Sequence, residues 1–496
     1  MRIPLRATLP VALLAAGLAL LPRPSAGQTN GFVLHCLSAR AAGLGCVTRG
    51  QEGIPTTLFH DPAGIVSFDR PAFEMNLSAF VPKLAFQNAS NAGADGSVHA
   101  YPMGSIAYVG KKLGRLSWAV GMDPIGGLGS DFRLTNPVLG ANQNYESFFM
   151  AAKMGPVVAY ELAPGFSIGG SVSLVYSQIR QFRMPFSMPS SAAAGMAGLA
   201  QLDLAHYPGM FAQMTELTAY GDSKSFTGTA VTGDLGVSWK ASPKLRMSAS
   251  WSPKTLIGLS GGSASMDMGA QFNAMYGAMV QERMVNHGQS QTAATATVAQ
   301  LLGAAGLDLS KGVVGTYDAG IDLSLPQTIG AGATYRPAAG WLLAFEGGWM
   351  GWSKAEHDMP FKLTNGNNTN LNLLINGNAT NASFTYPFPL RWKDSWIGKA
   401  GVEKTVGDGA VRLGWAYGSN PVPDNALFIT FPAIVEHSAI VGGTIKVGGM
   451  PLDIAFVHAF NKTMTAASTS LVGSEYRNSV TDLQENVLTV GTVVHF

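Results

Sequence analysis

Two cysteines, Cys36 and Cys46, are the only thiols of the chain, and they stand ten residues apart near its N-terminus. A pair of thiols can form a disulfide in an oxidising compartment, hold a metal ion, or remain as buried free thiols. A metal site that combined them with His35 and His60 would fit none of the standard ligand spacings, so no metal site is expected. The disulfide and the free thiols both stay open, because spacing alone does not fix their geometry.

A serine motif is the other pattern that could do chemistry. Residues 258–262 have the sequence Gly-Leu-Ser-Gly-Gly, which is the spelling of a nucleophile elbow. That motif needs a turn from a strand into a helix, whereas here the sequence predicts a strand that ends in a loop. No Ser-His pair, carboxylate pair or phosphate-binding loop accompanies it. We therefore predict a protein that is not an enzyme and needs no cofactor.

The composition indicates where such a chain resides. It has 496 residues, of which 47% are hydrophobic and 12% are charged, whereas soluble domains carry about 25% charged residues. The hydrophobic content excludes intrinsic disorder. A helical membrane protein needs runs of about 20 apolar residues, and only the extreme N-terminus has a long apolar run. The net charge is +2 without a basic block, so no nucleic-acid partner is expected.

The N-terminus is typical of a secretory signal peptide. Arg2 and Arg6 precede the apolar run 9–21, and small residues follow it up to Gly27. The alternative, an N-terminal membrane anchor, is disfavoured because the apolar run is too short. We predict a signal peptide over residues 1–27, export of the chain and a mature protein that begins around Gln28.

Apolar residues alternate with small or polar ones along much of the remaining chain. Val411, Leu413 and Trp415, for example, would share one face of a strand opposite Arg412 and Gly414. An outer-membrane barrel strand shows this period because one face meets lipid and the other the lumen. We predict an all-β fold, namely a transmembrane antiparallel β-barrel of about 14 strands over residues 71–496. Such runs begin near Phe73, His99, Arg115, Phe149, Phe166, Ala230, Lys244, Ile321, Trp341, Lys393, Gly409, Val435, Pro451 and Gln484.

The inward faces of these strands are mostly Gly, Ser and Ala. This composition predicts a lumen with less charge than a water-filled pore, and therefore an apolar passage through it. Tight turns at one rim and long segments at about 185–228, 261–320 and 356–390 place the long loops outside the cell.

Two stretches in the long loops, 191–217 and 266–284, are predicted to form short amphipathic helices. Their apolar faces could pack on each other as a cap, offer an adaptable landing site for greasy ligands, or do both. The faces consist of Met196, Leu199, Leu202 and His206 in the first stretch and Phe272, Met275, Met279 and Arg283 in the second.

Residues 28–70 do not alternate. They contain Gly, Pro and apolar clusters, which favours a compact plug inside the lumen over a disordered tail. Gly43 and Gly45 frame a Gly-Leu-Gly motif, and Asp61, Pro62 and Ala63 follow shortly before the first strand.

Several motifs, in this order, resemble the FadL/TodX family of outer-membrane transporters. The Gly-Leu-Gly and Asp-Pro-Ala motifs come first, although the family usually has Asn where this chain has Asp61. The matching blocks further along are Leu325-Pro326-Gln327-Thr328 with Trp341 and Trp352, Trp392-Lys393-Asp394, and Arg412-Leu413-Gly414 leading to Asn420-Pro421. The final strand ends on the aromatic Phe496, which resembles the closing strand of outer-membrane proteins.

The resemblance implies a protein of the bacterial outer membrane that takes up hydrophobic compounds passively, most of all long-chain fatty acids. Transport of aromatic or alkane hydrocarbons in the same fold is the main alternative, and a general diffusion porin is another. The implied partners are hydrophobic small molecules and outer-membrane lipid, with the protein acting as a monomer. The family releases its ligand through a lateral opening beside a kinked third strand, where Gly121, Pro124 and Gly126 stand here; the alternative is a simple rim turn.

A carboxylate ligand would also need a cation in the lumen to meet its head group. Basic residues on or beside the predicted strands are the candidates for this contact. They are Arg180, Arg183, Arg246, Lys393 and Arg412.

Overall fold

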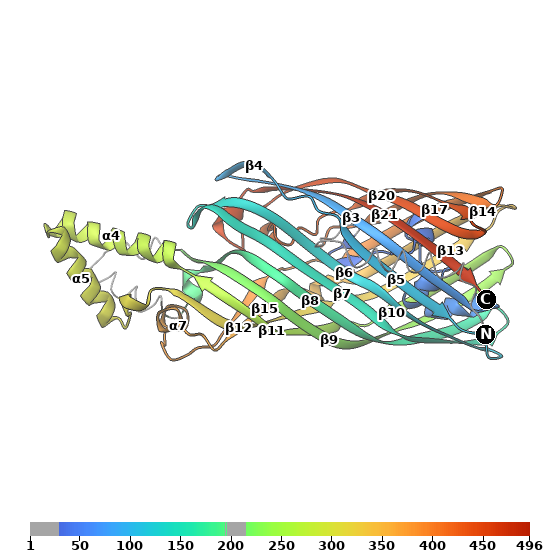
Figure 1. The fold of residues 1–496 in the computed structure, drawn as a ribbon, viewed down its shortest axis with the longest axis horizontal. Helices are drawn as coiled ribbons and strands as arrows, with labels where there is room; N and C mark the ends of the chain where they lie inside the picture. Colours follow the sequence, from blue (N-terminus) through green and yellow to red (C-terminus); the bar gives the residue numbers. More distant parts are fainter. Residues whose placement is uncertain (1–28, 194, 196–214) are drawn as a thin grey trace.

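The computed structural model describes residues 29–193, 195 and 215–496 (Figure 1). Its strands form one antiparallel sheet that closes on itself, because β21 (Val480–His495) pairs with β3 (Ala72–Asn88) from Val480↔Gln87 to His495↔Ala72. Several strands continue one another along the same path, so the wall has fourteen strands, as the alternation predicted. The expected signal peptide lies outside the described residues.

The strands follow one another around the barrel in chain order. They are β3, the short β4 (Asn91–Asp95) continued by β5 (Tyr101–Val109), β6 (Leu116–Asn136), β7 (Gly140–Ala163), β8 (Phe166–Pro189), β9 (Glu216–Ser242), β10 (Leu245–Ser252) continued by β11 (Thr255–Asp267), β12 (Val314–Leu325) continued by β13 (Gln327–Tyr335), β14 (Trp341–Gly351) continued by β15 (Asp358–Thr364), β16 (Phe384–Pro389) continued by β17 (Ser395–Val406), β18 (Gly409–Gly418), β19 (His437–Val447), β20 (Met450–Thr465) and β21.

The two faces of each strand meet different surroundings. On β8, Ile168, Val172 and Leu174 point outward and are 42–64% exposed, whereas Ser171 and Ser173 point inward and are buried. A belt of exposed aliphatic and aromatic side chains suits lipid, because lipid offers these groups the same environment as a protein core. Among the described residues, no helix is long and apolar enough to span a membrane.

Some strand boundaries differ from the sequence-based ones. β7 begins at Gly140 and β9 at Glu216, whereas the alternation placed their starts at Phe149 and Ala230. Beyond the apolar belt the ladder continues with exposed polar side chains such as Asn142 and Lys224, while Tyr145 and Phe226 remain buried. The described strand bounds leave connections shorter than expected, from Pro189 to Glu216, Asp267 to Val314 and Thr364 to Phe384.

Two helices, α4 (Gly269–His287) and α5 (Gln291–Ala304), stand beyond the barrel at the end opposite the C-terminus (Figure 1). The predicted face of α4 is buried, and α4 packs against α5, a helix that the sequence analysis did not predict. In the other predicted helical stretch, Met196, Leu199, Leu202 and His206 lie outside the described residues, and Glu216 already belongs to β9. The short helices α6 (Trp352–Ala355) and α7 (Thr369–Asn376) lie in later connections.

The N-terminal segment, residues 29–70, lies inside the ring of strands. It contains β1 (Thr29–Asn30), β2 (Val33–Leu34), α2 (Ala39–Gly43), η1 (Pro55–Phe59) and η2 (Pro62–Ser67). Helix α2 contacts β18–β21 while η2 contacts β7–β9, so the segment reaches across the barrel from one wall to another. Figure 1 shows it in dark blue, near the end of the barrel where the C-terminus lies.

Candidate functional site

Charged side chains that point inward hold the N-terminal segment in place. Glu346 of β14 accepts hydrogen bonds from the backbone N–H groups of Thr48 and Arg49, at 2.7 and 3.0 Å. The same carboxylate lies 2.8 Å from Nη1 of Arg49 and 2.9 Å from Nζ of Lys399 on β17, with all three side chains buried. Two cations and two backbone donors therefore satisfy one buried carboxylate.

A second carboxylate, Glu74 of β3, anchors the segment without a cation. It accepts hydrogen bonds from Ser38 Oγ at 2.8 Å, from the N–H and hydroxyl of Thr56 at 2.8 Å each, and from Asn76 Nδ2 at 3.0 Å. Four donors thus replace the water that the buried carboxylate has lost.

The glycines of the Gly-Leu-Gly motif allow the segment to touch the wall. Gly45 has φ +74°, and a methyl group added there would collide with the carbonyl oxygen of Ala400. The wall is equally bare at this place, because a methyl group on Gly401 or Gly414 would collide with Leu44 or Gly45. Gly43 lies over the side chain of Arg412. Backbone packs directly on backbone, which side chains would prevent.

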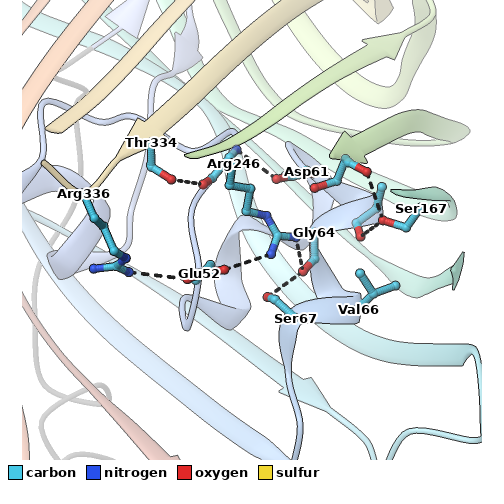
Figure 2. Close-up of polar contacts among 12 residues, drawn as sticks. Glu52, Asp61, Gly64, Val66, Ser67, Ser167, Arg246, Thr334 and Arg336 are labelled. Carbon is cyan, nitrogen blue, oxygen red and sulfur yellow. Dashed lines mark hydrogen bonds and ion pairs between the residues drawn. The ribbon is translucent and has the colours of Figure 1, made fainter. Parts of the chain in front are cut away.

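The Asp-Pro-Ala motif packs on the opposite wall, as Figure 2 shows. Asp61 is buried and accepts a hydrogen bond from Gly50 N at 3.0 Å, while Ser167 Oγ of β8 donates to Ala63 O at 3.2 Å. Burial raises the pKa of Asp61, and the positive charge of Arg246 opposes that rise. Arg246 thus supplies the positive neighbour that an Asp needs where the family usually has Asn.

The segment also contains a covalent link. Cys36 and Cys46 form a disulfide with their Cα atoms 5.5 Å apart. The bond encloses α2, the helix that rests on β18–β21. Among the described residues, no group of three or more His, Cys, Asp or Glu is placed to hold a metal ion.

The interior above the segment is apolar. Residues 421–435, between β18 and β19, fold into the barrel and are almost all buried. Phe32 lies at their base, with its ring 4.9–6.3 Å from the rings of Phe149, Trp352, Trp392 and Phe431. Nearer the α4 end, a pocket of about 50 Å³ is lined mainly by apolar side chains. Its ring-bearing residues are Phe186, Phe361, Phe384 and Tyr386.

The lumen is therefore divided, which corrects the sequence-based picture of a uniformly greasy passage. Around the N-terminal segment the inward face carries buried charges that alternation alone did not suggest. The main ones missed are Glu74, Lys153, Asp234, Glu346 and Lys399. The available signal was their register, since Glu346 and Lys399 interrupt series of small and aliphatic residues at inward positions.

The wall is interrupted between β5 and β6. Their ladder covers only Ile106↔Met122 to Val109↔Ala119, and β6 bulges between Pro124 and Gly126 against β7. Gly127 N instead donates to Phe32 O of the N-terminal segment, at 3.0 Å. Pro124 and Gly126 flank the bulge of β6, while Gly121 is still paired with Ala107 of β5. Gly121 and Gly126 approach Leu58 and Phe32 of the segment so closely that a methyl group at either would be crowded.

The five candidate head-group cations do not converge on one point. Arg412 binds Glu403 and Asp453, at 2.6 and 2.9 Å, beneath α2. Arg246 binds Glu52 at 3.4 Å and donates to Gly64 O at 3.1 Å (Figure 2). The other three lie outside the lumenal core: Arg183 pairs with Glu146 and Asp222, Arg180 is exposed over the ring of Phe148, and Lys393 is exposed in a connection.

A cavity of about 100 Å³ lies between the segment and the wall. Ile125, the bulged residue of β6, lines one side, and residues of β9, β10 and β13 line another. His35 and His60 also line it, and burial lowers the pKa of each to about 3, helped by the charge of Lys399 at His35 and of Arg49 and Lys399 at His60. Both imidazoles are therefore neutral at physiological pH.

The closed barrel, the outward apolar belt and the divided lumen together define an outer-membrane transport protein. Residues 24–495 match the family model described as outer membrane protein transport protein (OMPP1/FadL/TodX). The chain belongs to this family, which is made up of transport channels rather than enzymes.

Solved structures show the same fold at low sequence identity. The toluene transporter TodX of P. putida superposes with a TM-score of 0.63 at 14% identity, over 92% of this chain and 98% of that one. A FadL homologue of Pseudomonas aeruginosa gives 0.66 at 12% identity, over 94% and 100%. The toluene transporter TbuX of Ralstonia pickettii gives 0.60 at 14% identity, over 93% and 99%. A sequence search of curated proteins finds no match.

Glu346→Gln is expected to loosen the N-terminal segment without unfolding the barrel. It leaves Arg49 and Lys399 buried without their counter-charge, which costs about 3–5 kcal/mol. Trypsin should then cut folded protein at Arg40 or Arg49 faster than in the wild type, while the heat-dependent gel shift of the barrel persists. Lys446→Gln, which breaks an exposed ion pair with Asp408, is the control and should change neither. Equal cleavage rates in all three proteins would contradict the anchoring role of Glu346.

Acid should also loosen the segment. A free histidine has a pKa of about 6.5, so a detached segment binds more protons than the docked one as the pH falls from there towards 3. The histidine contribution to docking is thus complete above pH 6.5 and is lost progressively below it. We expect single-channel conductance to rise as the pH is lowered through this window, and to rise less in His35→Gln/His60→Gln. Identical pH curves for the two proteins would contradict this assignment.

Proposed function

We propose that the protein is a passive conduit for neutral hydrophobic compounds, hydrocarbons above all, across the outer membrane. The choice of a neutral ligand over a carboxylate rests on one observation. Every buried Lys and Arg of the described residues is already in an ion pair, while the interior above the N-terminal segment is aromatic and aliphatic. The ion-paired residues are Arg49, Lys153, Arg246, Arg283, Lys399 and Arg412.

A carboxylate would bind poorly in such an interior. Moving an ionised carboxylate out of water is costly unless a cation or several donors replace its hydration. Arg246 and Arg412, the two buried candidates for that contact, already bind carboxylates of the chain itself. A neutral ligand has no such requirement and gains from leaving water. The hydrocarbon alternative therefore has more support than the long-chain fatty acid.

The route has two parts. Ligand enters the apolar interior at the α4 end and moves down to Phe32, where the N-terminal segment acts as a plug that blocks the axial path. The discontinuity between β5 and β6 then offers a sideways exit, because no β5–β6 pair has to be broken there and only the contacts of the N-terminal segment with β6 have to open. No energy source is required, since each step lowers or holds the free energy of an apolar solute.

Ligand preference tests the proposed substrate class. Barrels in lipid nanodiscs should retain naphthalene above the level of empty nanodiscs, and should prefer it to oleate by about tenfold, or ~1.4 kcal/mol. The cations that already line the cavity, Arg49, Lys153 and Lys399, are ion-paired, whereas Met350→Lys adds one without a designed carboxylate partner and should raise oleate binding. Met350→Leu is the matched control. Oleate bound more tightly than naphthalene by the wild type would overturn the neutral-ligand proposal.

The sideways exit is tested at the bulge of β6. Pro124→Ala restores a backbone N–H beside the bulge and should favour a straighter strand, so uptake should fall by about twofold or more if release limits the rate. Pro156→Ala on β7, where the ladder with β6 is regular, is the control and should leave uptake unchanged. An unchanged rate in Pro124→Ala, with the barrel folded, would count against this exit.

A further inference from the structure

The wall has a second discontinuity, between β9 and the strand that runs from β10 into β11. β9 pairs with β10 up to Leu235↔Trp251, and its pairing with β11 resumes at Thr227↔Ser260. Between these points, residues 228–234 and 252–259 share no ladder pair in the part of the chain that the structure describes. We call these two stretches the β9–β11 seam.

The seam coincides with a break along the strand itself. β10 ends at Ser252 and β11 begins at Thr255, with Pro253 between them. The next strand breaks at the same height, where Pro326 separates β12 from β13. Proline has no N–H to donate, so neighbouring prolines at one level interrupt the ladder where it would otherwise hold the wall together.

The outer face of the seam is part of the apolar belt. Val231 is 70% exposed and lies opposite Leu174 of β8, one of the outward residues of that belt. Leu256 on the other side of the seam is 60% exposed. Lipid tails are therefore the expected neighbours of this part of the wall.

Side chains, rather than the backbone ladder, close the inside of the seam. Thr232 Oγ1 lies 2.7 Å from Thr255 Oγ1, and Ser252 Oγ donates to Asp234 Oδ1 at 2.6 Å. Asp234 keeps its other partners, because Lys153 lies 2.6 Å from its second oxygen. A single hydrogen bond contributes only modestly to stability, so these two contacts can open without unzipping a strand.

The same cavity reaches both discontinuities of the wall. Its lining includes Ile125 at the bulge of β6, and also Thr232, Ser252 and Pro253 at the seam. We propose that the β9–β11 seam is a second lateral port, through which neutral hydrophobic compounds pass between this cavity and the surrounding lipid. The proposal rests on the proposed function, since a port of this kind is of use only to a solute that prefers lipid to water.

A disulfide across the seam tests the port. Thr232→Cys/Thr255→Cys joins the two sides under oxidation, and Ser238→Cys/Ser248→Cys joins an inward pair of the same two strands where the ladder is regular. The measurement is the initial rate of naphthalene uptake into cells, oxidised and reduced. If passage through the seam limits the rate, the oxidised seam variant should be slower by about twofold and the control pair should be unaffected.

A second variant changes the seam in the opposite direction. Thr232→Val/Thr255→Val keeps the shape of both side chains but removes their hydrogen bond, a change that is nearly neutral for stability when both partners are replaced. This variant should take up naphthalene faster than the wild type, and it keeps the test valid if the cysteine pair prevents folding.

The outcomes separate the port from the proposed function. Uptake that is unchanged in both seam variants, with naphthalene binding intact in nanodiscs, overturns the port and leaves the proposed function standing. Equal slowing by the seam and control disulfides shows a general need for wall flexibility and also overturns the port. If wild-type barrels retain no more naphthalene than empty nanodiscs, both proposals are overturned.

Discussion

A strand in lipid must find a partner for every backbone N–H and C=O, because the hydrocarbon offers no water to bind them. The rest of this structure depends on that constraint. It requires β21 to pair with β3. Wherever the ladder stops, the backbone N–H and C=O groups left without a strand partner need another one. Between β5 and β6 the N-terminal segment supplies part of the substitute, through Phe32 O. At the β9–β11 seam, side chains of the wall close the gap instead.

The same constraint explains why the interior is divided. A segment threaded into a barrel brings its own polar backbone, and inward carboxylates such as Glu74 and Glu346 satisfy several of its N–H groups. The inward charges concentrate around the N-terminal segment for this reason, and their hydrogen bonds and ion pairs are used to hold it in place. Above the segment, residues 421–435 bring mostly apolar side chains into the lumen, so that part is suited to an uncharged solute.

Sequence reasoning succeeded where one local pattern determines the outcome. The alternation around Val411 and Leu413 predicted a strand, and fourteen such runs predicted the strand number. The buried face of α4, with Met275 and Met279, followed from helical spacing. The starts of β7 and β9 were missed because polar side chains take the exposed positions along the first part of each strand, where apolar ones were expected. Arg412 was considered as a ligand contact because its ion pairs depend on strand register: Glu403 faces it across the β17–β18 hairpin, and Asp453 lies 41 residues further along the chain.

The sequence by itself determined the class of fold, since an alternating period and a low charge are properties of each strand alone. It also determined where strands are weakened, because Pro124, Pro253 and Pro326 lack a backbone donor in any fold. Only the tertiary structure decided what those weak points face. Closure of the barrel brings Ile125 and Pro253 to one cavity and gives Lys153, Lys399 and Arg412 their carboxylate partners. Register and closure are long-range relations, and no local pattern of residues encodes them.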